Sequence, residues 1–204
     1  MLKLGLTGGI ASGKSSVAAM LREMGFAVLD ADSLGHRLSE PGQPAHEEIL
    51  KEFGPGIAAP DGRIDRSKLA AIVFSDRAKL DRLNAILHPR IRAAITEQFE
   101  RWQQSGIRDA AFVEAALLVE AGFTKNLDGL VVAWSTPKQQ MERLRARGLS
   151  DLDARRRIDA QLPVAEKLRH ATDTIDCTGT LEETRRQVEA LAHKLRSTPP
   201  SPKA

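Results

Sequence analysis

The sequence is poor in cysteine and in aromatic residues, and these shortages exclude several classes of protein. Cys177 is the one cysteine among 204 residues, so the chain forms no internal disulfide, which is typical of a reducing compartment. It has no tyrosine, two tryptophans and six phenylalanines, too few for a surface that stacks nucleic-acid bases. The net charge of +3 is also too small to indicate a nucleic-acid partner.

Long hydrophobic runs are missing as well. The longest apolar stretch, from Ala110 to Phe123, is interrupted by Glu114 and Glu120, so it does not predict a membrane span. The apolar run near the N-terminus is only a few residues long and leads into a glycine-rich loop, unlike a signal peptide. We therefore expect a cytoplasmic protein without a membrane partner.

One stretch carries a specific motif. Residues 8–15 read Gly-Gly-Ile-Ala-Ser-Gly-Lys-Ser, the G-x-x-x-x-G-K-S pattern of a phosphate-binding P-loop. An apolar stretch suited to a buried strand, residues 2–7, precedes it, and a stretch with apolar residues at helical spacing follows it. These flanks favour a P-loop over the alternative, a glycine-rich turn that happens to contain Lys-Ser.

The residue types of this loop suit a nucleoside triphosphate and Mg²⁺. Gly8 and Gly13 lack a Cβ, so the backbone N–H groups are able to turn towards a phosphate at the start of the following helix. Lys14 is placed to reach the β- and γ-phosphates, and the Ser15 hydroxyl to ligate Mg²⁺. The motif predicts these nucleotide-binding residues: Gly9, Ile10, Ala11, Ser12, Gly13, Lys14, Ser15 and Ser16.

Acidic residues close two further apolar strands. Residues 26–29 predict a strand that ends on Asp30-Ala31-Asp32, and ligands of open α/β sheets bind at this end of the strands. We expect one of the two aspartates to accept a hydroxyl proton, with Asp32 preferred, although a helix-capping role is the alternative. Glu114, in the predicted strand 111–115, either holds Mg²⁺, directly or through water, or faces solvent.

Helical patterns replace strand patterns between residues 33 and 107, which predicts an inserted helical module for the phosphate acceptor. Within it, His88-Pro89 predicts a helix boundary, because the residue before a proline avoids the helical conformation. His88 either contacts the acceptor or caps and packs a helix. Residues 141–164 are rich in arginine, which predicts either a solvated helix face or a mobile lid over the triphosphate. Within such a lid, Arg147 is the best candidate for contacting the transferred phosphoryl group, followed by Arg143 and the cluster 155–157.

The other segments complete a single predicted domain over residues 1–196. Residues 130–134 and 172–176 predict two more strands, and residues 181–195 predict a final amphipathic helix. The predicted core therefore comprises residues 1–32, 108–140 and 165–196. The Pro/Ser-rich residues 197–204 predict a disordered tail.

Taken in order, several motifs resemble those of the dephospho-coenzyme A kinases, and the resemblance runs from about residue 2 to residue 195. The motifs are Leu6 to Ser15, Leu29 to Asp32, Leu87-His88-Pro89, Leu117-Leu118-Val119-Glu120, and the stretch from Arg147 to Gln161. The resemblance implies an α/β P-loop NTPase fold of the nucleoside-monophosphate-kinase type. Such a fold has a five-stranded parallel sheet, an inserted helical substrate domain and a helical lid.

The resemblance also implies a reaction, in which ATP with Mg²⁺ phosphorylates the ribose 3′-hydroxyl of dephospho-coenzyme A to give coenzyme A. In that case Asp32 is the base, while Lys14 and Arg147 stabilise the transferred phosphoryl group. Ser15 and Glu114 are the expected metal ligands. The expected acceptor-binding residues are Asp32, His88, Leu117, Glu120 and Arg157. We expect a monomer or a weak homo-oligomer.

Three departures from the family pattern stand out. Ala116 occupies a position where the family usually has proline, and Cys177-Thr178 occupies that of an Asn-rich turn. A residue usually found between Arg147 and Gly148 is missing, so Arg145 is the alternative lid arginine.

Two other functions stay open at this point. The first is another small-molecule P-loop kinase, acting on a nucleoside monophosphate, gluconate or shikimate. The second is a nucleotide switch or a nucleic-acid-stimulated ATPase. A GTPase requires an Asn-Lys-x-Asp motif, which Asn126-Leu127-Asp128 does not provide.

Overall fold

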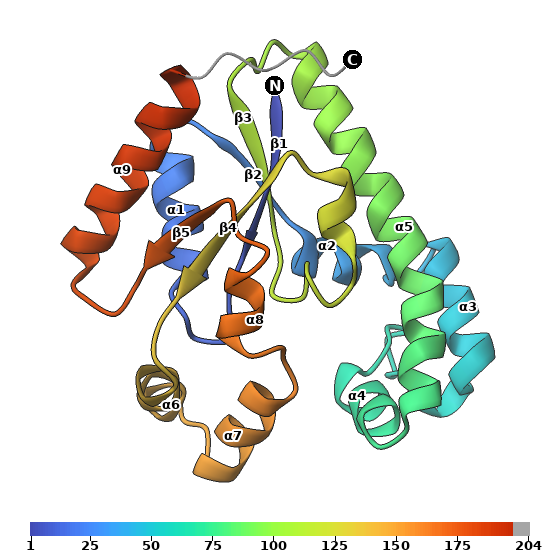
Figure 1. Ribbon diagram of the computed structural model, residues 1–204. Helices are drawn as coiled ribbons and strands as arrows, with labels where there is room; N and C mark the ends of the chain where they lie inside the picture. Colours follow the sequence, from blue (N-terminus) through green and yellow to red (C-terminus); the bar gives the residue numbers. More distant parts are fainter. Residues whose placement is uncertain (198–204) are drawn as a thin grey trace. The chain divides into compact units, whose positions relative to one another are not determined.

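The structure is a computed structural model that describes residues 1–197, apart from the side chain of Phe74. Its centre is a five-stranded parallel sheet with the strand order β2-β3-β1-β4-β5 (Figure 1). The strands are β1 (Leu2–Thr7), β2 (Ala27–Asp30), β3 (Ala110–Glu114), β4 (Gly129–Trp134) and β5 (Asp173–Asp176). The five parallel strands predicted from the sequence are thereby confirmed.

The chain divides into two compact units, which are described separately. The first unit contains residues 1–30 and the chain from residue 99 onwards, and the second contains residues 31–98. The bounds expected for the helical insert, 33–107, and for the lid, 141–164, stay predictions.

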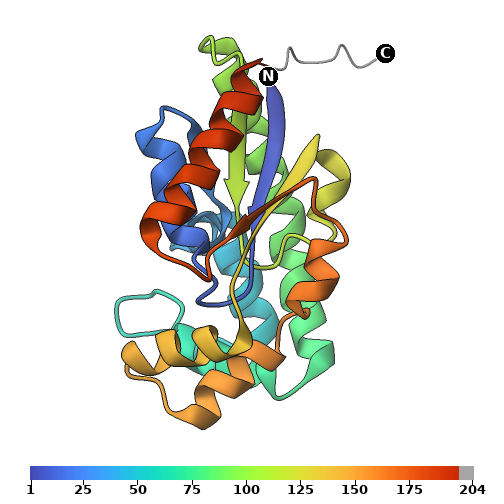
Figure 2. The same ribbon diagram turned by 60° about the vertical axis from the view of Figure 1, so that its left-hand side comes forward.

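The helices of the first unit lie between strands of the sheet in the chain, except the last helix, which follows the last strand. They are α1 (Lys14–Glu23), the 3₁₀ helix η2 (Phe123–Asn126), α6 (Pro137–Ala146), α7 (Asp151–Asp159), α8 (Val164–Leu168) and α9 (Leu181–Ser197). Helices α1 and α9 pack side by side on one face of the sheet, and α8 contacts β4 (Figures 1 and 2). Figure 2 shows α6 and α7 packed together beyond the carboxyl end of β4.

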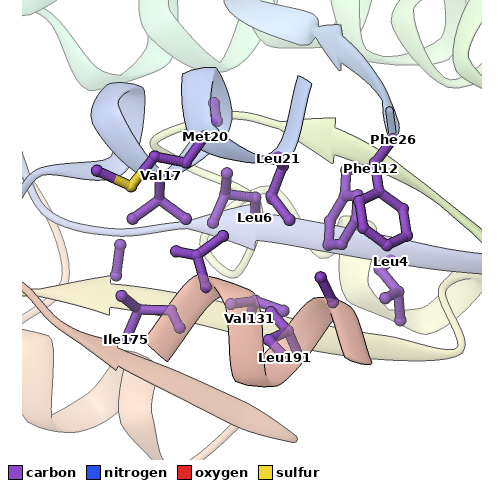
Figure 3. Close-up of a cluster of buried hydrophobic side chains, with 14 of the residues drawn as sticks. Leu4, Leu6, Val17, Met20, Leu21, Phe26, Phe112, Val131, Ile175 and Leu191 are labelled. Carbon is purple, nitrogen blue, oxygen red and sulfur yellow. The ribbon is translucent and has the colours of Figure 1, made fainter. Parts of the chain in front are cut away.

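The main hydrophobic core lies between the sheet and the pair α1 and α9. Figure 3 shows Leu6 of β1 and Val131 of β4 meeting Leu21 of α1 and Leu191 of α9. Phe112 of β3 is fully buried and meets Phe26 edge-on, with ring centroids 5.7 Å apart. Strands that are apolar on both faces are the expected consequence of a parallel sheet that is covered by connecting segments.

Caps define the start of helices α6 and α7. Thr136 and Gln139 form a capping box at the N-terminus of α6, where Pro137 occupies the first turn. The Ser150 side chain accepts from the backbone N–H of Asp153 at the N-terminus of α7. These local signals explain why a short connection separates the two helices at residues 147–150.

The second unit consists of helices around its own hydrophobic core. They are α2 (Ala31–Leu38), α3 (Pro44–Phe53), the 3₁₀ helix η1 (Pro55–Ile57), α4 (Arg66–Phe74) and the part of α5 (Arg77–Gln104) that precedes residue 99. Ile49 and Ile57 are buried at its centre with Val73. Asp65 caps α4 by accepting from the backbone N–H groups of Ser67 and Lys68.

The helix boundary predicted at His88-Pro89 is wrong, because α5 continues through Pro89 to Gln104. Proline removes one backbone donor from the helix and crowds the preceding turn. In that turn the Arg90 guanidinium donates to the Ile86 carbonyl at 2.6 Å and is itself paired with Glu48 of α3. The Ile86 contact lies within α5, whereas the Glu48 contact ties this part of the helix to α3.

Two further expectations concern the ends of the chain and the membrane. Ser197 is the last residue of α9 rather than the start of a disordered tail, and the rest of that predicted tail, residues 198–204, lies outside the described residues. Within residues 1–197, no helix combines the length and apolar character that crossing a membrane requires.

Candidate active site

The loop between β1 and α1 is packed so tightly that two of its glycines leave no room for a side chain. A Cβ on Gly8 would collide with the carbonyl oxygen of Ala133 in β4. A Cβ on Gly13, whose φ is +105°, would lie 2.8 Å from the Cβ of Cys177. Ala11 also has a positive φ, 57°. The chain therefore adopts the curled backbone that turns N–H groups towards an anion at the start of α1.

Ser12 supplies a second indication that the loop is built for a polar ligand. Its side chain is 1% exposed, and its hydroxyl has no hydrogen-bond partner within the described part of the chain. Buried polar groups are nearly always hydrogen-bonded in proteins, so such a group invites a partner from outside the chain. An unpartnered buried hydroxyl inside a glycine-rich cradle fits the phosphate chain of a nucleotide.

Lys14 lies at the N-terminus of α1, where its side chain is held by an acid from the neighbouring strand. Its Nζ is 2.8 Å from Oε1 of Glu114 at the end of β3, and both side chains are largely buried, at 13% and 7% exposure. The other carboxylate oxygen, Oε2, is 3.4 Å from an Nη of Arg22. Glu114 therefore faces two cations, rather than solvent, and it holds Lys14 beside the loop.

The strand ends bring several candidate residues to one edge of the sheet. Glu114 is in register with Leu6 of β1 and with Asp30 of β2. Ser15 is exposed in the first turn of α1. No group of three or more His, Cys, Asp or Glu side chains among residues 1–197 is arranged to hold a metal ion. A hydroxyl and a carboxylate nevertheless match the sparse protein ligation of a Mg²⁺ ion that is held mainly by phosphates and water.

Asp32 and His88 belong to the second unit. Asp32 is exposed in the first turn of α2, which begins directly after β2. His88 is half-buried in α5, where burial and the nearby charge of Arg92 lower its imidazole pKa. Helices α2 and α5 pack closely, since a Cβ on Gly35 would lie 3.2 Å from Cδ1 of Ile91. Asp32 lies three residues before Gly35 in α2, and His88 lies three residues before Ile91 in α5.

A cavity of about 240 Å³ adjoins the loop on the side of β5 and α9. Arg143 and Arg147 of the α6 region line it together with Gly13 and Thr184. Arg143 bridges the two sides, because it donates to the carbonyl of Ala11 at 3.0 Å and to the carbonyl of Cys177 at 2.7 Å. Two cations beside a phosphate-binding loop suit an anionic nucleotide.

The two candidate lid arginines are placed differently. Arg147 caps the C-terminus of α6 and lines the cavity beside the loop. Arg145 makes a bidentate pair with Asp151 at 2.5 and 2.7 Å, a contact that raises its pKa and holds the pKa of Asp151 below its usual range. Arg157 is exposed in the last turn of α7. The geometry favours Arg147 over Arg145 for a role at the phosphates.

The loop after β3 carries the remaining predicted residues. Leu117 is 45% exposed and available to a ligand. Glu120 is engaged within the protein, because its Oε1 is 2.7 Å from Nζ of Lys167 and accepts from the backbone N–H of Leu162 at 3.0 Å. Lys167, in α8, is fully buried.

Sequence reasoning missed three residues of this region. Arg22 and Lys167 were not singled out, because a cation within a helix usually lies on a solvated face. Gln140 is 5% exposed and crowds Gly9, and no sequence pattern marks a glutamine for that position. An acid that ends an apolar strand, such as Glu114, was the one signal that called for buried cations as partners.

Comparisons with known proteins agree on one family. The model of the family described as dephospho-CoA kinase matches residues 2–183. The chain belongs to the dephospho-CoA kinase family. A dephospho-CoA kinase from Symbiobacterium thermophilum is 48% identical over 188 residues, which cover 92% of this chain and 78% of the relative. The P-loop, the strand-end acids and the arginine-rich helices are therefore features of a kinase of this family.

Solved structures give the same answer for the fold. The crystal structure of TT1252 from Thermus thermophilus superposes with a TM-score of 0.83 at 37% identity, covering 95% of this chain and 97% of that one. A dephospho-CoA kinase from Campylobacter jejuni superposes with a TM-score of 0.71 at 28% identity, covering 94% of this chain and 96% of that one. The predicted α/β P-loop kinase fold is confirmed.

Proposed function

We propose that this protein transfers the γ-phosphate of ATP to the ribose 3′-hydroxyl of dephospho-coenzyme A, giving coenzyme A and ADP in the last step of coenzyme A biosynthesis. The observation that carries the proposal is that curated dephospho-CoA kinases match this chain over nearly its whole length. The P-loop with its buried Lys14–Glu114 pair supports the ATP half of the reaction.

The chemical step is an in-line displacement at the γ-phosphorus. The ribose oxygen forms a bond to phosphorus, the bond from phosphorus to the β–γ bridging oxygen breaks, and ADP leaves. Asp32 accepts the proton of the attacking hydroxyl. Lys14 and Arg147 stabilise the charge that the transferred phosphoryl group and the leaving oxygen share, which is the main catalytic contribution in phosphoryl transfer.

The loop backbone between Gly9 and Ser16 holds the phosphates. The Ser15 hydroxyl, with Glu114 directly or through water, would hold Mg²⁺, which would neutralise phosphate charge when bound. Lys14 exchanges its contact with Glu114 for one with the phosphates when the nucleotide binds. Arg22 then continues to compensate the charge of Glu114, because it contacts the other carboxylate oxygen.

The acceptor contacts the residues predicted for it: Asp32, His88, Leu117, Glu120 and Arg157. The depressed pKa of His88 keeps its imidazole neutral at pH 7, so it acts as a hydrogen-bonding group rather than as a cation. The exposed Leu117 offers an apolar contact. We place the enzyme in the cytoplasm as a monomer or a weak homo-oligomer, and light scattering coupled to size exclusion measures that state.

The test of this function is ADP production with Mg-ATP and a panel of acceptors. The panel contains dephospho-coenzyme A, adenosine, AMP, CMP, shikimate and gluconate. We expect turnover with dephospho-coenzyme A alone. Turnover with shikimate or gluconate instead would leave the P-loop assignment in place and reject the proposed acceptor.

The role of Asp32 has its own test. Asp32→Asn is expected to lower kcat by roughly 10²–10⁴-fold, because the amide cannot accept the hydroxyl proton. The affinity for ATP should change little, since the P-loop holds the nucleotide. Asp30→Asn is the matched control two residues earlier. Near-normal turnover of the Asp32 variant would remove this residue from the mechanism.

A further inference from the structure

The segment between α7 and β5 is tied at three points to the loops that follow β1 and β3. The side-chain Oε1 of Gln161 accepts from the backbone N–H of Ile10 in the P-loop at 2.7 Å. The backbone N–H of Leu162 donates to Glu120 at 3.0 Å. Lys167 Nζ contacts Glu120 at 2.7 Å and donates to the carbonyl of Ala116 at 2.6 Å. Gln161 therefore contacts one loop, while Leu162 and Lys167 contact the other.

Stability alone does not explain a lysine at position 167. The side chain is fully buried, and desolvating an ammonium costs several kcal/mol that an ion pair often fails to recover. An apolar side chain of the same length would fill the same space without that cost. Unlike an apolar side chain, lysine makes a directional hydrogen bond, and its ammonium fixes the Ala116 carbonyl. The same carbonyl also accepts from the Thr7 hydroxyl at 3.2 Å.

The Ala116 carbonyl lies between two residues of the candidate site in the chain. Glu114, which holds Lys14, lies two residues before it, and the exposed Leu117 follows it directly. Lys167 and Glu120 thus fix both ends of the turn 116–120, because Lys167 holds its first carbonyl and Glu120 is its last residue. The conformation of this turn decides how Leu117 is presented to a ligand.

Gln161 acts on the other loop. The Gly9-Ile10 stretch is fixed from two sides, because Gln140 leaves no room for a Cβ on Gly9 and Gln161 binds the N–H of Ile10. The two glutamines also line, with Gly9, a cavity of about 440 Å³ between this loop and helices α6 to α8. Ser12, whose N–H bonds to the carbonyl of Gly9 at 3.1 Å, depends on this stretch for its position.

We propose that Gln161 and Lys167 are positioning residues that serve the two substrates separately. Gln161 sets the P-loop backbone and thereby the binding of ATP, whereas Lys167 sets the turn 116–120 and thereby the binding of the acceptor. The acceptor half rests on the proposed function. The two residues lie on one short segment, yet their loss is expected to affect different substrates.

The experiment compares Gln161→Met with Lys167→Met, because methionine keeps the length of both side chains and removes the polar contact. Gln161→Met should raise KM for ATP about tenfold, the effect of one well-placed hydrogen bond, and leave KM for dephospho-coenzyme A within about twofold. Lys167→Met should give the reverse pattern. Exposed residues supply the matched controls Gln104→Met and Lys138→Met, which should leave both constants unchanged.

Additional variants separate positioning from folding. Gln161→Glu keeps an acceptor for the Ile10 N–H and should restore the melting temperature of Gln161→Met if that has fallen. Lys167→Met combined with Glu120→Gln removes both charges of the pair, so it should melt near the wild-type temperature even if Lys167→Met alone is destabilised. A fall in melting temperature with both KM values unchanged would overturn the proposal, as would equal changes of both KM values in each variant.

Failure of the proposed function would look different. If the wild type does not phosphorylate dephospho-coenzyme A, the acceptor half is rejected together with that function. The nucleotide half is then decided by the dissociation constant of ATP measured by equilibrium dialysis. A weaker ATP affinity in Gln161→Met but not in Lys167→Met supports it, and equal affinities overturn it.

Discussion

Charged side chains are buried and paired at the P-loop but exposed along α6 and α7. Lys14 and Glu114 are 13% and 7% exposed and lie 2.8 Å apart. Arg145 and Asp151 form a contact of 2.5 Å at 52% and 66% exposure. The first unit therefore contains two short ion pairs, one buried and one exposed to solvent.

The difference is energetic. Water and salt screen an exposed pair, so it contributes little and is readily exchanged for another partner. The charges of a buried pair attract each other more strongly, and removing one partner leaves an unpaired buried charge, which is costly in free energy. The Lys14–Glu114 pair is consequently in place before a ligand binds, while an exposed side chain such as Arg145 exchanges partners more readily.

The largest effect is expected from Lys14→Met. It removes the cation that we propose meets the phosphates and leaves Glu114 with Arg22 alone, so kcat/KM should fall roughly 10³-fold. Steady-state kinetics with Mg-ATP and dephospho-coenzyme A measure the fall, with the exposed Lys138→Met as control. A loss below tenfold would mean that Lys14 is not where the charge is stabilised.

Arg147→Met is expected to come next, with a fall in kcat of roughly 10²-fold, because a cation that meets developing phosphoryl charge is lost. Arg145→Met is its matched partner two residues away, and it breaks an exposed pair with Asp151. The Arg145 variant should retain its kcat within about twofold. A reversed order would assign the lid role to Arg145.

Arg22→Met should have a smaller effect. The guanidinium is 44% exposed and 3.4 Å from Glu114. Its removal should therefore lower kcat/KM by no more than about fivefold. The expected change is larger at low ionic strength, because salt screens the exposed arginine. Kinetics at two salt concentrations measure it, and a salt-independent loss would contradict the screened environment.

The smallest effect concerns Cys177 beside the P-loop. Burial raises the pKa of its thiol, so the folded state prefers the neutral form. This contribution to the free energy of unfolding is complete below the thiol pKa of the unfolded chain and is lost as the pH rises through the higher folded value. The free energy of unfolding of the wild type, measured with urea, should therefore fall above about pH 9. The free energy of unfolding of Cys177→Ala should fall less over the same pH range.

The strand, loop and helix that form the P-loop side could be predicted well from the sequence. Short apolar strands, a glycine loop with Lys-Ser and an acid at a strand end are local signals, and local backbone rules translate them into structure. The helix break at Pro89 was the opposite case, because the contacts of Arg90 with Ile86 and Glu48 hold α5 together across it. Propensity rules fail where contacts elsewhere in the fold stabilise a helix that has lost one backbone hydrogen bond.

The sequence by itself determined the parallel sheet and the P-loop before α1, and it supplied the residues that we propose hold a nucleotide. Only the tertiary structure decided which partners the charged groups take. Lys14 and Glu114 are 100 positions apart in the chain, and Lys167 and Ala116 are 51 positions apart. The physical reason is that backbone patterns are set by neighbours in the chain, whereas burial and pairing of charge depend on segments that only folding brings together.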